Sequence, residues 1–149
     1  YIQELSRVLR YTLQGNDSKS VTLRDEMEFV SAYIFLLKMR FEDNLSFDIR
    51  IDKQYDDHRL PPMAVQMLIE NAVKHNEISD RRPLSIRVYT EGEELVVTNP
   101  VQPKLTATAG TGVGLANLAK RYHLLYKCEI QITENKYFTV RIPLIPNAL

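Results

Sequence analysis

The chain has 149 residues, of which 44% are hydrophobic and 26% are charged, a composition that suits one globular domain with its own core. Its 19 basic and 19 acidic residues balance, so no overall charge draws it to nucleic acid or to an anionic membrane. The single cysteine, Cys128, excludes an internal disulfide, and no apolar run is long enough to span a bilayer. These features predict a cytoplasmic domain with no direct contact with nucleic acid or membrane.

The first predicted elements are two helices and a strand. Residues 2–13 place apolar side chains at helical spacing, and the polar stretch after Gly15 ends that helix. Thr22 begins a capping box, and the apolar stripe after it predicts a long amphipathic helix that runs to Phe41. Residues 45–51 then alternate between apolar and polar, which indicates a strand with one buried face.

The middle of the chain predicts a third helix, a hairpin and a loop. Pro61 and Pro62 suit the first turn of a helix that ends near His75. Residues 84–90 and 93–98 alternate on either side of a turn, as the strands of a hairpin do. Residues 100–109 contain two prolines and show no period, which predicts a mobile loop without an anchor to the core.

The last predicted elements are a helix and two strands. The helix follows the glycine-rich residues 110–114, and residues 128–133 and 137–143 form the strands, with Cys128 facing inward. One face of this helix carries Leu115, Leu118, Tyr122 and Leu125. The order of all elements favours an α+β fold, a two-layer α/β sandwich whose mixed sheet of about five strands has helices on one face.

The third helix carries a compact group of polar residues opposite its apolar side. These residues are Glu70, Asn71, Lys74 and His75. At this spacing an amide oxygen, an ammonium group and an imidazole could converge on metal-bound phosphates. Four polar residues taken alone more often form the solvated face of an amphipathic helix, so the group needs a second signal.

The second signal is the glycine-rich turn formed by Gly110, Gly112 and Gly114. Glycines let backbone amides approach a ligand closely, and the helix that follows presents its positive end to an anion. A flexible hinge or an ordinary helix start would use the same residues. The turn lacks the pattern of a dinucleotide fingerprint or a P-loop.

Together the two segments resemble the N box and the second glycine box of histidine kinases. Residues 66–76 read QMLIENAVKHN, and residues 110–118 read GTGVGLANL. Residues 5–11 (LSRVLRY), the helix start at residues 21–23 (VTL) and residues 38–43 (KMRFED) narrow the resemblance to the LytS/YehU-type branch. The resemblance covers nearly the whole chain.

The resemblance implies the ATP-binding fold shared with gyrase, the heat-shock chaperone ATPases and MutL, with ATP and Mg²⁺ as cofactors. Asn71 is expected to coordinate Mg²⁺, and Glu70 is expected to orient the attacking imidazole or accept its proton. The expected nucleotide-binding residues are Asn71, Lys74, His75, Asn99, Gly110, Gly112, Gly114, Leu115 and Thr139. Within this set the three glycines anchor the end of a lid, and Thr139 helps to recognise adenine.

One segment departs from the family pattern. The first glycine box normally holds an aspartate that accepts a hydrogen bond from the adenine amino group, and Asn99 followed by Pro100 stands in its place. A neutral amide oxygen accepts a weaker hydrogen bond than a carboxylate, so weaker ATP binding is expected. Pro100 also fixes its own φ, which alters the path of the following loop.

The expected function is that of a two-component sensor histidine kinase. We expect residues 21–149 to transfer the γ-phosphate of ATP to a histidine upstream of Tyr1, for relay to an aspartate of a response regulator. Residues 1–20 are predicted to be the tail of the helical dimerisation and phosphoacceptor region, through which a membrane-bound parent protein forms a homodimer. His58 and His123 are predicted to be surface or packing residues.

Two alternatives remain open at this point. The first is a degenerate kinase domain that binds nucleotide weakly and acts as a dimerisation or docking module, which the Asn99–Pro100 departure suggests. The second is a stand-alone ATPase or a protein serine kinase with the same fold.

Overall fold

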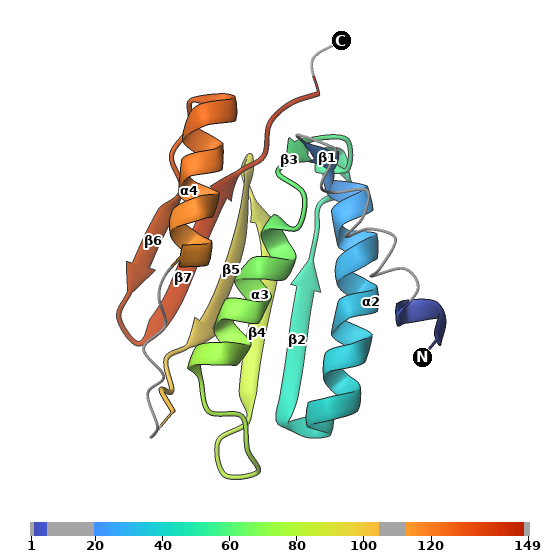
Figure 1. Cartoon of the computed structure of the whole chain (residues 1–149), viewed down its shortest axis with the longest axis vertical. Coiled ribbons are helices and arrows are strands. Elements are labelled where there is room, and N and C mark those ends of the chain that lie inside the picture. Colours follow the sequence, from blue (N-terminus) through green and yellow to red (C-terminus); the bar gives the residue numbers. More distant parts are fainter. Residues whose placement is uncertain (1, 6–19, 105–112, 148–149) are drawn as a thin grey trace.

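The computed structural model describes residues 2–5, 20–104 and 113–147 (Figure 1). Its named helices in these ranges are α2 (Leu23–Phe41), α3 (Ala64–His75) and α4 (Val113–Tyr126), with short 3₁₀ helices at Glu42–Asn44 and Lys53–Tyr55. The strands are β1 (Val21–Thr22), β2 (Leu45–Arg50), β3 (Arg59–Leu60), β4 (Leu84–Glu91), β5 (Glu94–Pro100), β6 (Gln131–Glu134) and β7 (Tyr137–Pro143). Residues 2–5 are helical, and residues 6–13 of the first predicted helix lie outside the described ranges. No described helix combines the length and apolar character needed to cross a membrane.

The main sheet has five strands in the order β2-β4-β5-β7-β6. Strands β2 and β4 are parallel, with Leu45 opposite Leu84, and α3 lies on the connection between them. The remaining pairs are antiparallel. Strands β4 and β5 form the predicted hairpin, and its turn contains Gly92 at a φ of +61°. A glycine is favoured at this position because a Cβ atom destabilises the left-handed conformation.

The three long helices cover one face of the sheet, which confirms the predicted two-layer α+β sandwich (Figure 1). The core lies between the layers, where side chains such as Leu23, Leu68 and Ile86 are almost completely buried. Side chains on the other face of the sheet are largely polar. They include the pairs Ser46–Ser85, Arg87–Asp48, Thr98–Thr139 and Arg141–Glu91. One buried and one polar face is the usual arrangement of a sheet in a two-layer fold.

The start of α3 differs from the prediction. The two prolines precede the helix rather than form its first turn, and α3 begins at Ala64 after Met63, which has a φ of +66°. The fully buried carboxylate of Glu26 on α2 accepts hydrogen bonds from the backbone N–H groups of Met63 and Val65, at 3.0 and 2.9 Å. A side chain distant in the sequence therefore satisfies the free N–H groups that a local cap normally satisfies.

The region after α4 also differs from the prediction. Cys128 was expected on a strand, but β6 begins three residues later, at Gln131. Cys128 instead belongs to the turn that ends α4: its N–H donates to the carbonyl of Tyr122, and Lys127 before it has a φ of +55°. On α4 itself, Leu118 and Tyr122 are buried as predicted, whereas Leu125 is 40% exposed.

Candidate functional site

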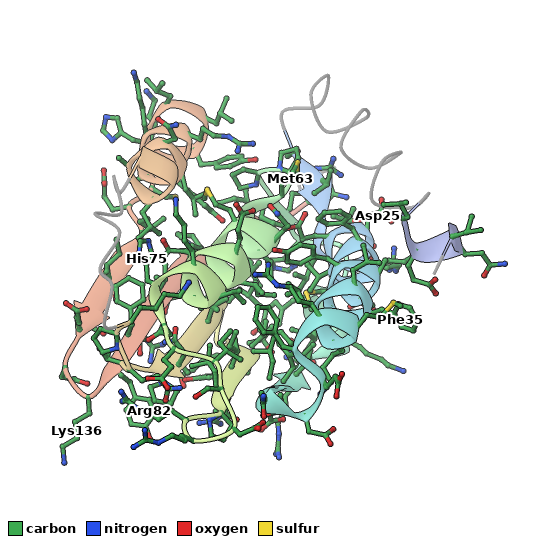
Figure 2. All side chains as sticks on the ribbon, turned by 60° about the horizontal axis from the view of Figure 1, so that its bottom comes forward. Asp25, Phe35, Met63, His75, Arg82 and Lys136 are labelled. Carbon is green, nitrogen blue, oxygen red and sulfur yellow. The ribbon has the colours of Figure 1, made fainter. Side chains whose placement is uncertain are left out.

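Two residues of the predicted polar group lie on the flank of α3 that faces α4. Met67 marks this flank, because its sulfur atom lies 3.2 Å from the position that a Cβ atom would take at Gly114 of α4. Asn71 and His75 follow Met67 at intervals of one helical turn and are both half-buried. No described residue donates a hydrogen bond to either side chain or accepts one from it, so both remain available to a ligand. Figure 2 shows His75 at the end of α3 opposite to Met63.

Glu70 lies on the other flank of α3, which faces α2. Its carboxylate accepts a hydrogen bond of 2.7 Å from Gln66, one turn earlier, and Gln66 also forms a hydrogen bond with Tyr33 of α2. Burial and the nearby negative charge of Glu70 raise the pKa of Tyr33 to about 12. The predicted group is therefore divided: Glu70 faces α2, Asn71 and His75 face α4, and the exposed Lys74 lies between the two flanks.

The first turn of α4 lies directly beside α3. Gly114 lies at this contact, because a Cβ atom there would be 3.2 Å from the Met67 sulfur atom, closer than ordinary van der Waals contact. Leu115 is half-buried and packs against the core. Since the N-terminus of a helix carries a partial positive charge, α4 presents that charge near Met67, one helical turn before Asn71. The predicted residues Gly110 and Gly112 lie outside the described residues.

The end of β5 is held beside the end of α3. The backbone N–H of Gln102 donates to the side-chain oxygen of Asn76 at 2.8 Å, and the N–H of Glu77 donates to the Gln102 carbonyl. The Gln102 side chain, which is 7% exposed, donates to the carbonyls of Glu77, Arg82 and Pro83. The prediction of an unanchored loop is thus wrong for residues 100–104, while residues 105–109 lie outside the described ranges. This clamp places Asn99, which is 2% exposed, near the His75 end of α3.

The structure does not bring Thr139 to the other predicted site residues. Val140 and Ile142 of β7 pack in the core under the helices, so their neighbour Thr139 points to the opposite face of the sheet. There its hydroxyl lies 2.7 Å from that of Thr98. The β7 residue directly opposite Asn99 is Phe138, which lies on the same face of the sheet and is half-buried.

Comparison with known proteins identifies the family. A family model described as histidine kinase matches residues 1–45. The sensor protein LytS of Streptococcus agalactiae serotype V is 31% identical over 143 residues, which cover 84% of this chain and 24% of LytS. The sensor histidine kinase BtsS of Escherichia coli K12 is 31% identical over 153 residues, which cover 95% of this chain and 27% of BtsS. The chain belongs to the sensor histidine kinase family.

The chain spans about a quarter of the length of these sensor histidine kinases. Solved structures show the same fold. The catalytic domain of histidine kinase ThkA superposes with a TM-score of 0.55 at 19% identity, over 85% of this chain and 95% of that domain. The cytoplasmic segment of histidine kinase QseC superposes with a TM-score of 0.59 at 10% identity, over 85% of this chain and 76% of that segment. The fold is therefore that of a histidine kinase catalytic domain.

Several residues that shape the candidate site were not identified from the sequence. Glu26 could have been found, because it lies at helical spacing between Leu23 and Val30 on the apolar stripe of α2, where a carboxylate must have a buried partner. The Gln102 clamp has no local sequence signal, because its partners lie 19 to 26 residues away. His123 is exposed and pairs with Glu129 at 2.8 Å, and the half-buried His58 packs edge-on against Tyr55, consistent with their predicted surface and packing roles.

Proposed function

We propose that this chain binds Mg-ATP between α3, the end of β5 and the first turn of α4, as the catalytic domain of a sensor histidine kinase. The convergence of these three elements carries the proposal. The close contact between Gly114 and Met67 brings α4 to one flank of α3, and the clamp around Gln102 brings the end of β5 to the same region. Asn71 and His75 lie on that flank without a hydrogen-bond partner among the described residues.

The residues present fit a magnesium–nucleotide complex. Mg²⁺ in nucleotide sites is held by one or two protein oxygens together with phosphates and water, rather than by a cage of protein ligands. The amide oxygen of Asn71 supplies one such ligand. The described residues contain no cluster of three or more His, Cys, Asp or Glu side chains that could hold a metal. Bound Mg²⁺ would neutralise charge on the β- and γ-phosphates.

The side chains around Asn71 would then hold and orient the nucleotide. Lys74 lies three residues further along the helix, within one turn, and its exposed ammonium group can reach phosphate oxygens. His75 and the N-terminus of α4 provide further N–H donors for phosphate oxygens. Asn99 would accept a hydrogen bond from the adenine amino group, with Leu115 close to the nucleotide.

The proposed reaction transfers the γ-phosphoryl group of ATP to an imidazole nitrogen of a histidine outside this chain, with release of ADP. Positioning and neutralisation of charge supply most of the acceleration in such transfers. Glu70 faces α2, so it would receive a proton only from an acceptor histidine that approaches over the α2 side of the site. We further propose that the whole protein dimerises through helices that include residues 1–20 and passes its phosphoryl group to an aspartate of a response regulator.

Calorimetric titration of the chain with ATP, with and without Mg²⁺, tests the proposed function. We expect binding that depends on Mg²⁺ and that is strongly weakened in Asn71→Ala, because this change removes the metal ligand and spares the core. Asn147→Ala, at an exposed position, is the matched control and should bind like the unchanged chain. Absence of binding at millimolar ATP would overturn the proposal.

A further inference from the structure

The turn that leads into α3 holds one residue in a strained conformation. Met63, directly before the helix, has a φ of +66°, and residues other than glycine rarely adopt this left-handed region (Figure 2). The turn has little freedom, because Pro61 and Pro62 are both buried and each fixes its own φ. A residue stays in such a conformation only where the surrounding contacts hold it there.

The two helices on either side of α3 supply those contacts (Figure 1). The fully buried carboxylate of Glu26 on α2 accepts from the N–H of Met63 with one oxygen and from the N–H of Val65 with the other. From the side of α4, the guanidinium group of Arg121 donates to the carbonyl of Pro62 at 3.3 Å. The start of α3 is therefore held from both sides, and Glu26 forms two of these three hydrogen bonds.

A local cap would satisfy the same N–H groups with less difficulty. A serine or aspartate at position 63 could cap the helix without burying a carboxylate, which is costly. The two solutions differ in what they fix. A local cap moves with its helix, whereas Glu26 can reach both N–H groups only when α3 begins at one place relative to α2. The apolar contacts of α3 do not define that place as closely, because they have no direction.

The helix itself connects this start to the candidate site. Asn71 lies six residues after Val65, about 9 Å along the helix axis. The far end of α3 is held separately, because the side-chain oxygen of Asn76 accepts from the N–H of Gln102 at 2.8 Å. Release of the start would therefore tilt α3 about its far end, and Asn71 would move. Mg²⁺ demands nearly ideal ligand geometry, so even a small movement of a ligand weakens its binding.

We propose that Glu26 is a positioning residue for the magnesium–nucleotide site: it fixes the start of α3 and thereby places the amide oxygen of Asn71 where it ligates Mg²⁺. This inference rests on the proposed function, because the ligand that it concerns is Asn71. Glu26 is fully buried and bonded to the backbone, so it acts on the site only through α3. Its contribution to Mg-ATP binding should therefore disappear once Asn71 is removed.

A double-mutant cycle between Glu26→Gln and Asn71→Ala tests the proposal, with Mg-ATP affinity measured by calorimetry. Glutamine keeps the shape of Glu26, but its amide nitrogen would face one of the two N–H groups, donor against donor. Glu26→Gln alone should weaken Mg-ATP binding about tenfold, and in the Asn71→Ala background it should weaken it by less than about twofold. Glu28→Gln removes the same charge at an exposed position of α2 and should leave the affinity unchanged.

A second pair of variants tests the same turn with Glu26 intact, and it decides the question if Glu26→Gln does not fold. Valine is β-branched and resists a positive φ, whereas asparagine adopts one more readily. Met63→Val should therefore weaken Mg-ATP binding in the chain that has Asn71 but not in Asn71→Ala. Met63→Asn, which also removes the methionine side chain, should bind like the unchanged chain. Urea denaturation establishes that each variant compared is folded.

Two results would overturn the inference and leave the proposed function in place. One is an equal loss of Mg-ATP affinity from Glu26→Gln with and without Asn71, which would show that Glu26 does not act through that ligand. The other is an unchanged affinity in folded variants of lower stability, which would show that Glu26 supports the fold alone. If the unchanged chain does not bind Mg-ATP at millimolar concentration, the proposed function fails and the inference fails with it.

Discussion

The two flanks of α3 differ in whether their polar side chains have partners within the protein. On the flank that faces α2, Gln66 donates to Glu70 and also bonds with Tyr33, so the polar groups there are partnered within the protein. On the flank that faces α4, Asn71 and His75 have no hydrogen-bond partner among the described residues. Partly buried polar groups are costly without a partner, and this cost supports our proposal that the second flank binds the ligand.

The difference between the two flanks of α3 is tested most directly by removing one polar residue from each flank. Asn71→Ala should weaken Mg-ATP binding on the order of a hundredfold, because a metal ligand is lost, whereas Glu70→Ala should change it by less than about threefold. Calorimetry on the two variants measures both effects. Equal losses would show that the flanks act as one site and that the partners of Glu70 do not set it apart.

The second prediction concerns the anchor that holds α3 against α2. Glu26→Ala should lower the free energy of unfolding by about 2–4 kcal/mol, because the N–H groups of Met63 and Val65 would lose their acceptors in a buried place. Glu28→Ala, two residues away and exposed, is the control and should change stability by less than about 0.5 kcal/mol. Urea denaturation measures both. Similar midpoints for the two variants would contradict the role of Glu26.

The third prediction tests whether the contact between Gly114 and Met67 holds α4 against α3. Gly114→Val should separate α4 from α3 and weaken ATP binding several-fold, because the added side chain meets Met67. Met67→Ala opens space at that point, so the double variant should recover part of the loss, and a double-mutant cycle measures the coupling. Additive effects of the two changes would show that this contact does not position α4.

The smallest expected effect concerns the pH dependence of stability, to which Tyr33 contributes on the flank that faces α2. The pKa of Tyr33 is raised from 10.0 to about 12 in the folded chain, mainly by burial and then by Glu70. Folding therefore favours the neutral phenol, so this contribution to stability is complete below pH 10 and is lost as the pH rises toward 12. Tyr33→Phe should reduce the fall in stability across this window, measured by denaturation at several pH values. An unchanged pH dependence would show that folding does not raise the pKa of Tyr33.

Local patterns predicted the elements well because each depends on near neighbours in the sequence. The N-cap at Thr22, the hairpin turn at Gly92 and the last strand are examples, and the structure confirms them. Local patterns predicted the structure less well wherever a partner that is distant in the sequence sets the local conformation. Pro61 and Pro62 suited a helix start by local rules, yet Glu26, 37 residues from Met63, moves that start to Ala64.

The candidate site shows the same limit at single positions. Alternation along β7 indicates that Phe138 and Thr139 face opposite sides of the sheet, but it does not say which side the helices cover. The tertiary structure places Phe138 on the side of Asn99 and Thr139 with Thr98. Likewise, helical spacing grouped Glu70 with Asn71, and only the neighbours of α3 separate them.

The sequence by itself determined the identity of the family, the two-layer class of the fold and the segments from which the site is built, since these depend on residue types at fixed local spacing. Tertiary structure alone decided which polar side chains of α3 have partners within the protein, where the chain is clamped by Gln102, and how Pro100 orients the Asn99 amide. These features depend on hydrogen bonds whose direction follows from the packed positions of both partners. Their energies are gained only once the helices and the sheet have come together.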